Sequence, residues 1–300
     1  MTIFLTGASG YIGGAVALRL MQDGHRIRGL VRSPEKAAQL QTLGIEPVLG
    51  DLSDLALLTR EAKAADAVVN AASADDRAAV EAMLDALAGS GKPFLHTSGT
   101  SVVADDARGE WASDRIYDED TPAEPVPGKA ARVAIDRLIV EAAGRGVRSV
   151  VLCNSLIYGT GPGLNADSVQ IPALVAAARK TGVVRHIGRG LNIWSNVHVD
   201  DMADLYALAL DRAPAGAFYY VENGEASFAE AAAAIARRLG LGAPQPWPVD
   251  DAIGVLGFGH AVYSLGSNSR VRGKRARAEL GWAPKHGSPI EWIETEMPVG

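Results

Sequence analysis

Residues 2–13, Thr-Ile-Phe-Leu-Thr-Gly-Ala-Ser-Gly-Tyr-Ile-Gly, decide how this chain of 300 amino acids folds. The apolar start of the segment predicts a β-strand, which runs directly into the evenly spaced glycines Gly7, Gly10 and Gly13. The periodic apolar residues from Tyr11 to Asp23 then predict a helix that ends at a glycine, a common C-terminal cap. Such a unit suits phosphate binding, because glycines let an anion approach bare backbone and the helix start offers free N–H groups.

A second apolar segment, Ile27 to Val31, predicts the next strand. The order strand, glycine turn, helix, strand is typical of dinucleotide-binding domains. The spacing G-x-x-G-x-x-G differs from the common G-x-G-x-x-G pattern, so a purely structural turn is the alternative. We expect dinucleotide contacts from the turn residues Gly7, Ser9, Gly10, Tyr11, Ile12 and Gly13.

Arg32 directly follows the second strand, at the place where dinucleotide-binding domains distinguish their cofactors. A carboxylate there binds the ribose 2′-hydroxyl of NAD, whereas an arginine accommodates the 2′-phosphate of NADP. The alternative is a solvated surface arginine. The sequence therefore predicts NADP as the cofactor.

Asp51 and Leu52 follow a short third strand, Glu46 to Leu49. The carboxylate of Asp51 is suited to accept a hydrogen bond from an adenine amino group, and Leu52 to cover the ring. A second role for Asp51, compatible with the first, is to cap a helix that begins near Ser53.

Strand and helix patterns alternate four times in the first hundred residues, which predicts an α/β fold with a doubly wound parallel sheet. Ala71 and Ala72 end the fourth strand, where small side chains leave space for the cofactor. Ser98 and Thr100 end the fifth strand, Pro93 to Thr97. We expect their hydroxyls either to bind a substrate oxygen, with Ser98 also near the cofactor, or only to close a turn.

The composition excludes several classes of partner. A formal net charge of -6 and a pI near 5.6 argue against nucleic acid and against an anionic membrane surface. The basic run 270–277 fits a solvated helix face better than a nucleic-acid site. The single cysteine, Cys153, rules out an internal disulfide and indicates a cytoplasmic protein, and no apolar run reaches the length of a membrane span.

Motifs distributed over nearly the whole chain resemble the short-chain dehydrogenase/reductase superfamily, and more narrowly its extended and atypical branch of NAD-dependent epimerase/dehydratase-like proteins. The matching segments are residues 6–13, 50–52, 70–72, 97–99, 158–159 and 197–201. The resemblance implies NAD(P) and a Rossmann domain over residues 1–155, completed by about residues 192–215. It further implies a smaller C-terminal substrate region over residues 156–191 and 216–300, a small-molecule substrate, and a homodimer as one assembly to consider.

The chain departs from that family where its catalytic Tyr-x-x-x-Lys motif is expected. If the family motif is aligned on Asp136, Gly128 stands at the position of its tyrosine and Arg132 at the position of its lysine. If it is aligned on Lys129, Pro125 stands at the position of the tyrosine. The serine of the family falls on Gly99. The candidate catalytic residues that remain are Ser98, Thr100, Lys129 and Arg132.

Other aromatic residues and histidines have simpler explanations. We expect Tyr117 on a surface loop, Tyr158 in a packing role and His198 in the core, with no metal site, because no other His or Cys lies at ligand spacing from it. Residues 254–266, which contain Phe258, His260 and Tyr263, are assigned neither to a helix nor to a loop. We expect them to form an apolar wall of the substrate pocket.

Together these features predict an NADP-dependent oxidoreductase that transfers hydride between nicotinamide and a small, rather apolar carbonyl substrate, with a non-standard proton donor. Two alternatives stay open. One is an epimerase or dehydratase that acts on a nucleotide sugar, and the other is a non-catalytic NADP-binding redox sensor.

Overall fold

The computed structural model, which describes residues 1–121 and 124–299, is built on one seven-stranded sheet. The spatial order is β11-β7-β5-β4-β1-β2-β3, and every neighbouring pair is parallel. The strands are β1 (Thr2–Thr6), β2 (Arg26–Val31), β3 (Glu46–Leu49), β4 (Ala67–Asn70), β5 (Pro93–Gly99), β7 (Arg148–Asn154) and β11 (Ala217–Val221). The predicted doubly wound parallel α/β fold is confirmed.

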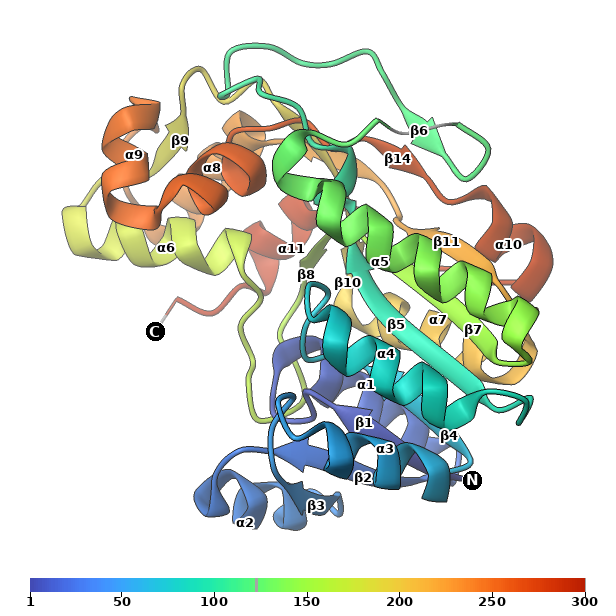
Figure 1. The fold of residues 1–300 in the computed structure, drawn as a ribbon. Helices are drawn as coiled ribbons and strands as arrows, with labels where there is room; N and C mark the ends of the chain where they lie inside the picture. The colour runs from blue at the N-terminus through green and yellow to red at the C-terminus, as the bar shows by residue number, and fades with distance from the viewer. Residues whose placement is uncertain (122–123, 300) are drawn as a thin grey trace.

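Helices cover both faces of this sheet (Figure 1). One face packs on α1 (Tyr11–Gln22), α2 (Pro34–Thr42), α7 (Val199–Arg212) and α10 (Lys274–Leu280). The other face packs on α3 (Leu55–Ala64), α4 (Arg77–Leu87) and α5 (Ala130–Glu141). Side chains alternate along each strand, so Ile3 and Leu5 enter the first core while Phe4 enters the second.

A smaller lobe lies beside the carboxyl ends of the central strands (Figure 1). It has its own core, in which Trp194, Phe228 and Trp292 are buried. Its strands are β8 (Leu156–Tyr158), β9 (Arg185–Ile187), β10 (Ile193–His198), β12 (Glu225–Ser227) and β13 (Gln245–Trp247). Its helices are α6 (Gln170–Thr181), α8 (Phe228–Leu239), α9 (Val249–Leu256), the π-helix η4 (Gly259–Leu265) and α11 (Pro289–Thr295).

Short elements connect the two parts. The strands β6 (Tyr117–Asp118) and β14 (Val271–Arg272) pair in parallel, and the 3₁₀ turns are η1 (Thr100–Val103), η2 (Pro127–Lys129) and η3 (Ala142–Arg145). The side chain of Asn268 donates to Asp105, and the hydroxyl of Ser269 donates to the carbonyl oxygen of Thr100. The segment before β14 therefore ties the smaller lobe to the end of β5.

The structure shifts one boundary that the sequence suggested. β11 lies within the range 216–300 that was expected in the substrate region, yet it is an edge strand of the large sheet, because its backbone pairs with β7. α10 and Trp282 also pack on the large-sheet core. We retain the division into a cofactor part and a substrate part as a proposal, with these segments assigned to the cofactor part.

The basic run 270–277 is neutralised within the chain. All five of its cations form ion pairs: Arg270 and Arg272 with Glu225, Lys274 with Asp118, Arg275 with Asp120, and Arg277 with Glu222. These carboxylates come from both lobes, so the run contributes to internal structure.

Candidate cofactor groove and active site

The turn between β1 and α1 requires glycine for two different reasons. Gly7 has a φ of +76°, and a Cβ there would lie 2.7 Å from the backbone carbonyl of Ala71. A Cβ on Gly13 would lie 2.2 Å from the carbonyl oxygen of Gly7. Gly10 is the N-cap of α1 and provides no side-chain cap, so the first N–H groups of the helix are available to an anion.

A groove of about 630 Å³ runs along this turn. Eight of the expected cofactor-binding residues line it: Gly7, Ser9, Gly10, Arg32, Asp51, Leu52, Ala71 and Ala72. Tyr11, Ile12 and Ser98 instead line a neighbouring cavity, and Gly13 packs beneath Gly7. Lys36 and Asn165 also line the groove, and the sequence reasoning missed both.

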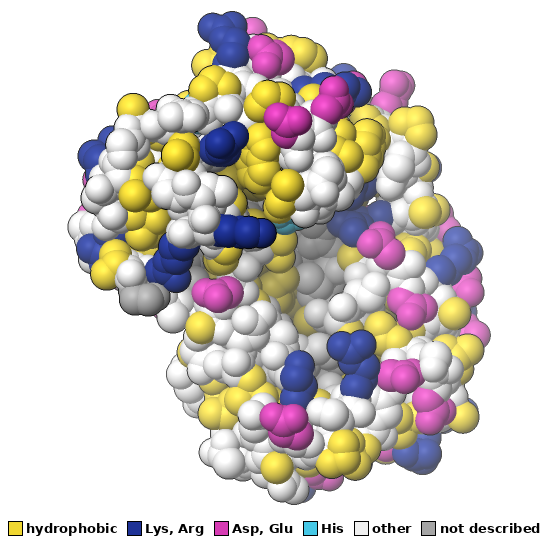
Figure 2. Space-filling model, turned by 90° about the vertical axis from the view of Figure 1, so that its left-hand side faces the viewer, with side chains coloured by type: hydrophobic (Ala, Val, Ile, Leu, Met, Phe, Trp, Pro, Cys, Tyr) yellow, Lys and Arg dark blue, Asp and Glu magenta, His cyan; other side chains and the backbone are white. Residues whose placement is uncertain are grey.

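The groove has a cationic end. Arg32 and Lys36 are exposed beside the start of α2, whose N-cap Ser33 accepts a hydrogen bond from the Lys36 backbone N–H. Both cations line the groove, and both lie at the positive end of the α2 dipole. This combination suits a phosphate group. Figure 2 shows the molecule hollowed between the two lobes, with Lys and Arg side chains beside the hollow.

Asp51 is held in a turn and does not cap a helix. Its Oδ1 accepts hydrogen bonds from the backbone N–H of Ser53 at 2.8 Å and from the Ser53 hydroxyl at 2.5 Å. These bonds, together with the nearby charge of Arg32, lower the pKa of Asp51. The N-cap of α3 is Asp54, which accepts from the Leu57 N–H, so the capping role expected for Asp51 belongs to its neighbour.

A second cavity, of about 370 Å³, lies at the carboxyl ends of β5 and β7. All four candidate catalytic residues line this cavity, although they come from four different elements, β5, η1, η2 and α5: Ser98, Thr100, Lys129 and Arg132. The cavity also contains Ser168, Gln170, Trp194 and Tyr263. It adjoins the groove through consecutive residues of one turn, because Gly10 lines the groove and Tyr11 lines the cavity.

The hydroxyls of Ser98 and Thr100 already form hydrogen bonds within the protein. Ser98 Oγ donates to Asp136 Oδ2 at 2.8 Å, and both side chains are buried. Burial raises the pKa of Asp136 to about 7, against the opposing effects of Ser98 and Arg132. Thr100 has no exposed surface, and its Oγ1 accepts from Ser269 Oγ at 2.8 Å. This geometry favours a structural role for Thr100, which joins the two lobes.

Arg132 and Lys129 make the cavity cationic. Arg132 donates through Nε and Nη2 to both carboxylate oxygens of Asp75, and through Nη1 to Ser101 Oγ at 3.1 Å. The bidentate pairing holds the guanidinium at a fixed angle beside Gly99. Burial, followed by the charge of Arg132, lowers the pKa of Lys129. The Lys129 ammonium lies 5.5 Å from the centre of the Tyr263 ring.

Two of the tyrosines considered from the sequence lie outside this cavity in packing roles. Tyr158 donates its hydroxyl hydrogen bond to the carbonyl oxygen of His286 at 3.1 Å, and its ring meets the edge of His198. Tyr117 pairs with Val271 through β6 and carries the Arg115 guanidinium 4.7 Å from its ring centre. Neither lines the cavity that holds the candidate catalytic residues.

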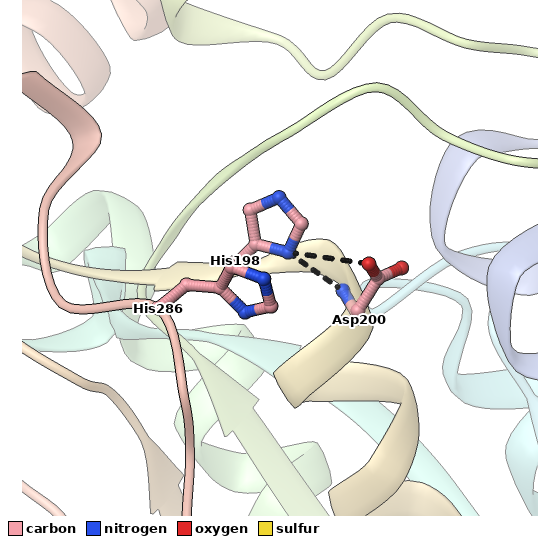
Figure 3. Close-up of side chains that lie close together, drawn as sticks. All are labelled: His198, Asp200 and His286. Atoms are coloured by element: carbon pink, nitrogen blue, oxygen red, sulfur yellow. Dashed lines mark hydrogen bonds and ion pairs between the residues drawn. The ribbon is translucent and has the colours of Figure 1, made fainter. Parts of the chain in front are cut away.

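Two histidines and a carboxylate meet at the start of α7 (Figure 3). His198 Nδ1 accepts from the backbone N–H of Asp200 at 3.2 Å, and the His198 and His286 rings stack 3.9 Å apart at an interplanar angle of 23°. Nitrogen lone pairs lie in the ring planes, so stacked rings cannot direct both at one ion about 2.1 Å away. His198 therefore caps α7 and packs against His286. The sequence spacing did not reveal this contact with His286.

Comparison with known proteins agrees with the fold. The model of the NAD dependent epimerase/dehydratase family matches residues 3–221. An uncharacterized protein of Saccharomyces cerevisiae is 31% identical over 313 residues, with 98% of each chain covered. The 4-hydroxy-2-methyl-3-oxo-4-farnesyl-3,4-dihydroquinoline-1-oxide ketoreductase of Stigmatella aurantiaca is 26% identical over 335 residues, with 100% of this chain and 98% of the relative covered.

A solved structure shares the architecture. The dTDP-glucose 4,6-dehydratase of Bacillus anthracis, in complex with NAD, superposes with a TM-score of 0.76 at 19% identity, covering 99% of this chain and 97% of the other. The chain belongs to the NAD dependent epimerase/dehydratase family, which confirms the resemblance seen in its motifs. None of the helices in the described residues combines the length and the apolar character needed to cross a bilayer.

Proposed function

We propose that this protein is an NADP-dependent oxidoreductase that transfers hydride between nicotinamide and a small carbonyl-type substrate. The observation that supports this most is the junction of two cavities at one turn. A glycine-lined groove with cations at one end meets, through Gly10 and Tyr11, a cavity that contains Lys129 and Arg132. The reductase name of one full-length relative points the same way.

The residues of the groove fit a dinucleotide phosphate. At Gly7 the turn approaches the backbone of Ala71 too closely for any side chain, so bare backbone faces the groove there. Arg32 and Lys36 would hold the 2′-phosphate of NADP, and Leu52 would cover the adenine. When bound, NADP supplies the hydride, and the protein supplies position and electrostatics.

The chain's own residues prepare the cavity for a carbonyl oxygen. Arg132, fixed by Asp75, and Lys129 provide positive charge that stabilises an oxygen as it becomes negative. Ile157, Val169 and Trp194 give the cavity apolar surface, which favours a substrate of low polarity.

A non-catalytic NADP-binding sensor is the second candidate, and one observation favours it. Gly128 and Gly99 occupy the positions at which the family resemblance implies a catalytic tyrosine and serine, and the Ser98 hydroxyl is bound to Asp136. A sensor would bind NADPH without turning over any substrate.

Turnover assays separate these candidates. Purified protein is incubated with NADPH and a panel of aldehydes, ketones, enones and imines while absorbance at the nicotinamide band is followed; dTDP-glucose and UDP-glucose are added in parallel. Oxidation of NADPH with a carbonyl compound is expected. Tight NADPH binding without any turnover would favour the sensor, and conversion of a sugar nucleotide without net NADPH loss would favour an epimerase or dehydratase.

Two finer expectations belong to the same proposal. A cytoplasmic location is supported by the single buried Cys153, which suits a reducing compartment, and is checked by cell fractionation. A homodimer stays a prediction, which sedimentation of the purified protein tests.

A further inference from the structure

Tyr263, in the π-helix η4, lines the cavity that also contains Lys129 and Arg132. The cavity has one other tyrosine among the described residues, Tyr11, and its hydroxyl donates to the Gly159 carbonyl oxygen at 2.8 Å. Burial also raises the pKa of Tyr11. The hydroxyl of Tyr263 is half-buried and forms no hydrogen bond with residues 1–121 or 124–299. Among the residues that the structure describes, Tyr263 therefore has the only phenol in the cavity whose hydroxyl is not already hydrogen-bonded.

The ring of Tyr263 occupies the space in front of Gly128. A Cβ added to Gly128 would lie 3.2 Å from Tyr263 Cε2 and 3.5 Å from its hydroxyl oxygen, so a larger residue there would require the ring to move. Gly128 is the position at which alignment on Asp136 implies a tyrosine in the family. The phenol of Tyr263 thus reaches from the smaller lobe to the place where a side chain of residue 128 would begin.

Positive charge lies near the phenol of Tyr263. The Lys129 ammonium lies 5.5 Å from the ring centre, and Arg132 lines the same cavity. A cation close to a phenol stabilises the phenolate that forms when the proton leaves. Lys129 neighbours Gly128 in the sequence, so one short turn, η2, holds both the cation and the glycine against which the Tyr263 ring lies.

The segment that carries Tyr263, η4, is held by buried side chains and has the uncommon geometry of a π-helix. Ala261, Val262 and Leu265 of η4 are buried, and Phe258 contacts the Tyr263 ring edge to face at 5.5 Å between centroids. π-helices are rare and occur often at functional sites. Here the wider turn directs Tyr263 and Ser264 into the cavity, while Ala261 and Leu265 pack in the core of the smaller lobe.

We propose that Tyr263 is the proton donor of this enzyme, acting from η4 in place of a tyrosine on the segment before α5; the inference rests on the proposed reductase function. In reduction, the carbonyl carbon gains the hydride and the carbonyl oxygen gains the phenolic proton, so the C=O bond becomes a C–OH group. The substrate is reduced by two electrons and the nicotinamide is oxidised. The phenolate, stabilised by Lys129, regains its proton from water.

The first test is the substitution Tyr263→Phe, which keeps the ring and removes the hydroxyl. With the panel member that the wild type reduces fastest, kcat is expected to fall about 10²–10⁴-fold, while the NADPH dissociation constant stays unchanged. The matched control is Tyr117→Phe, which removes a phenol outside the cavity and is expected to leave kcat within about twofold. The pH dependence of kcat should lose one ionisation in the Tyr263 variant only.

The second test needs no turnover. In protein labelled with ¹³C at the tyrosine Cζ atoms, the signal absent from Tyr263→Phe identifies Tyr263. Adding the same carbonyl compound to the NADP⁺ complex, which cannot reduce it, should shift that signal, because the phenol then donates to the carbonyl oxygen. A further variant, Gly128→Tyr combined with Tyr263→Ala, returns a phenol to the same space and should restore part of the lost kcat.

The outcomes distinguish two failures. If Tyr263→Phe retains kcat within about threefold of the wild type, or if the ¹³C signal of Tyr263 in the wild type does not respond to the ligand, the assignment of Tyr263 is wrong and the reductase function stands. If the wild type binds NADPH and reduces no member of the panel, the proposed function fails and the assignment of Tyr263 fails with it.

Discussion

At the scale of single residues, Arg32 and Lys36 are the two cations that the proposed function assigns to the 2′-phosphate of NADP. Both are exposed in the described structure and line the groove, and Asp51 across from them already accepts two hydrogen bonds from Ser53. The nearby Arg26 and Arg28 pair with Glu46 and Glu61, whereas Arg32 forms no ion pair with a carboxylate of the described residues, so it can bind an added phosphate. Selectivity for NADP should depend on these two residues.

Replacing Arg32 tests this selectivity. Arg32→Asp is expected to weaken NADPH binding by about 10–100-fold, because a charge-assisted contact to phosphate is lost, while NADH binding changes little. The control is Arg26→Asp, at the opposite end of the same strand, where the side chain is 78% exposed. Titration of intrinsic fluorescence with each nucleotide measures both constants. An unchanged NADPH/NADH affinity ratio in Arg32→Asp would contradict the NADP assignment.

Asp136 is a buried acid whose protonation affects stability. Its pKa is raised to about 7 by burial, whereas an unfolded chain would give about 3.9. The folded protein thus binds this proton more tightly than the unfolded chain does. The contribution to stability is greatest below about pH 4 and is lost progressively as the pH rises toward 7.

Asp136→Asn removes this titration. Between pH 5 and pH 8 the free energy of unfolding of the wild type should fall by about 2–3 kcal/mol relative to that of the variant. Urea unfolding at the two pH values measures the difference, with Asp211→Asn, an exposed acid, as the control. If the wild type and Asp136→Asn differ in their free energy of unfolding by the same amount at pH 5 and pH 8, Asp136 is ionised over this whole range.

At the scale of elements, the start of α7 fastens the C-terminal segment to the core. The carboxylate of Asp201 is buried and accepts hydrogen bonds from the backbone N–H groups of Lys285 and His286, each at 2.9 Å. The Asp201 carbonyl oxygen accepts from the indole of Trp282. One residue of α7 thus connects α10 to the segment that leads to α11.

Asp200 and Asp201, which are adjacent at the start of α7, should contribute very different amounts to the free energy of unfolding. Asp201→Ala leaves two backbone donors without a partner, and the free energy of unfolding should fall by about 2–4 kcal/mol. Asp200→Ala should cost much less, because the backbone N–H that binds His198 is retained. Urea unfolding of both variants at one pH provides the comparison. Equal effects of the two substitutions would contradict this role for Asp201.

The elements also show what sequence patterns can predict. The strand, glycine turn and first helix could be read directly, because Gly7 and Gly13 are required by local backbone geometry. Residues 254–266 could not be assigned, because they contain the end of α9 and then a π-helix, 259–265, whose period neither the helix nor the strand pattern matches. The pairing of His198 with His286 and of Thr100 with Ser269 depends on long-range packing, which leaves no signal in sequence spacing.

At the scale of the whole molecule, the two lobes contribute different residues to the candidate site. The large-sheet part supplies most of the groove, the turn before α1 and the cations of η2 and α5, whereas the smaller lobe supplies Trp194, Gln170 and Tyr263 to the cavity. The candidate site could be located from the sequence because most of its residues lie at strand ends of the large sheet. The contribution of the smaller lobe could not, since it depends on how η4 packs across Gly128.

The most direct test of the proposed function is transfer of deuterium from labelled cofactor. The protein is incubated with NADPH that carries deuterium at both C4 positions and with the carbonyl panel, and the alcohols are analysed by mass spectrometry. One deuterium per product molecule, on the former carbonyl carbon, is the predicted result. NADPH that stays bound and fully labelled in the presence of every compound would contradict the assignment as a reductase.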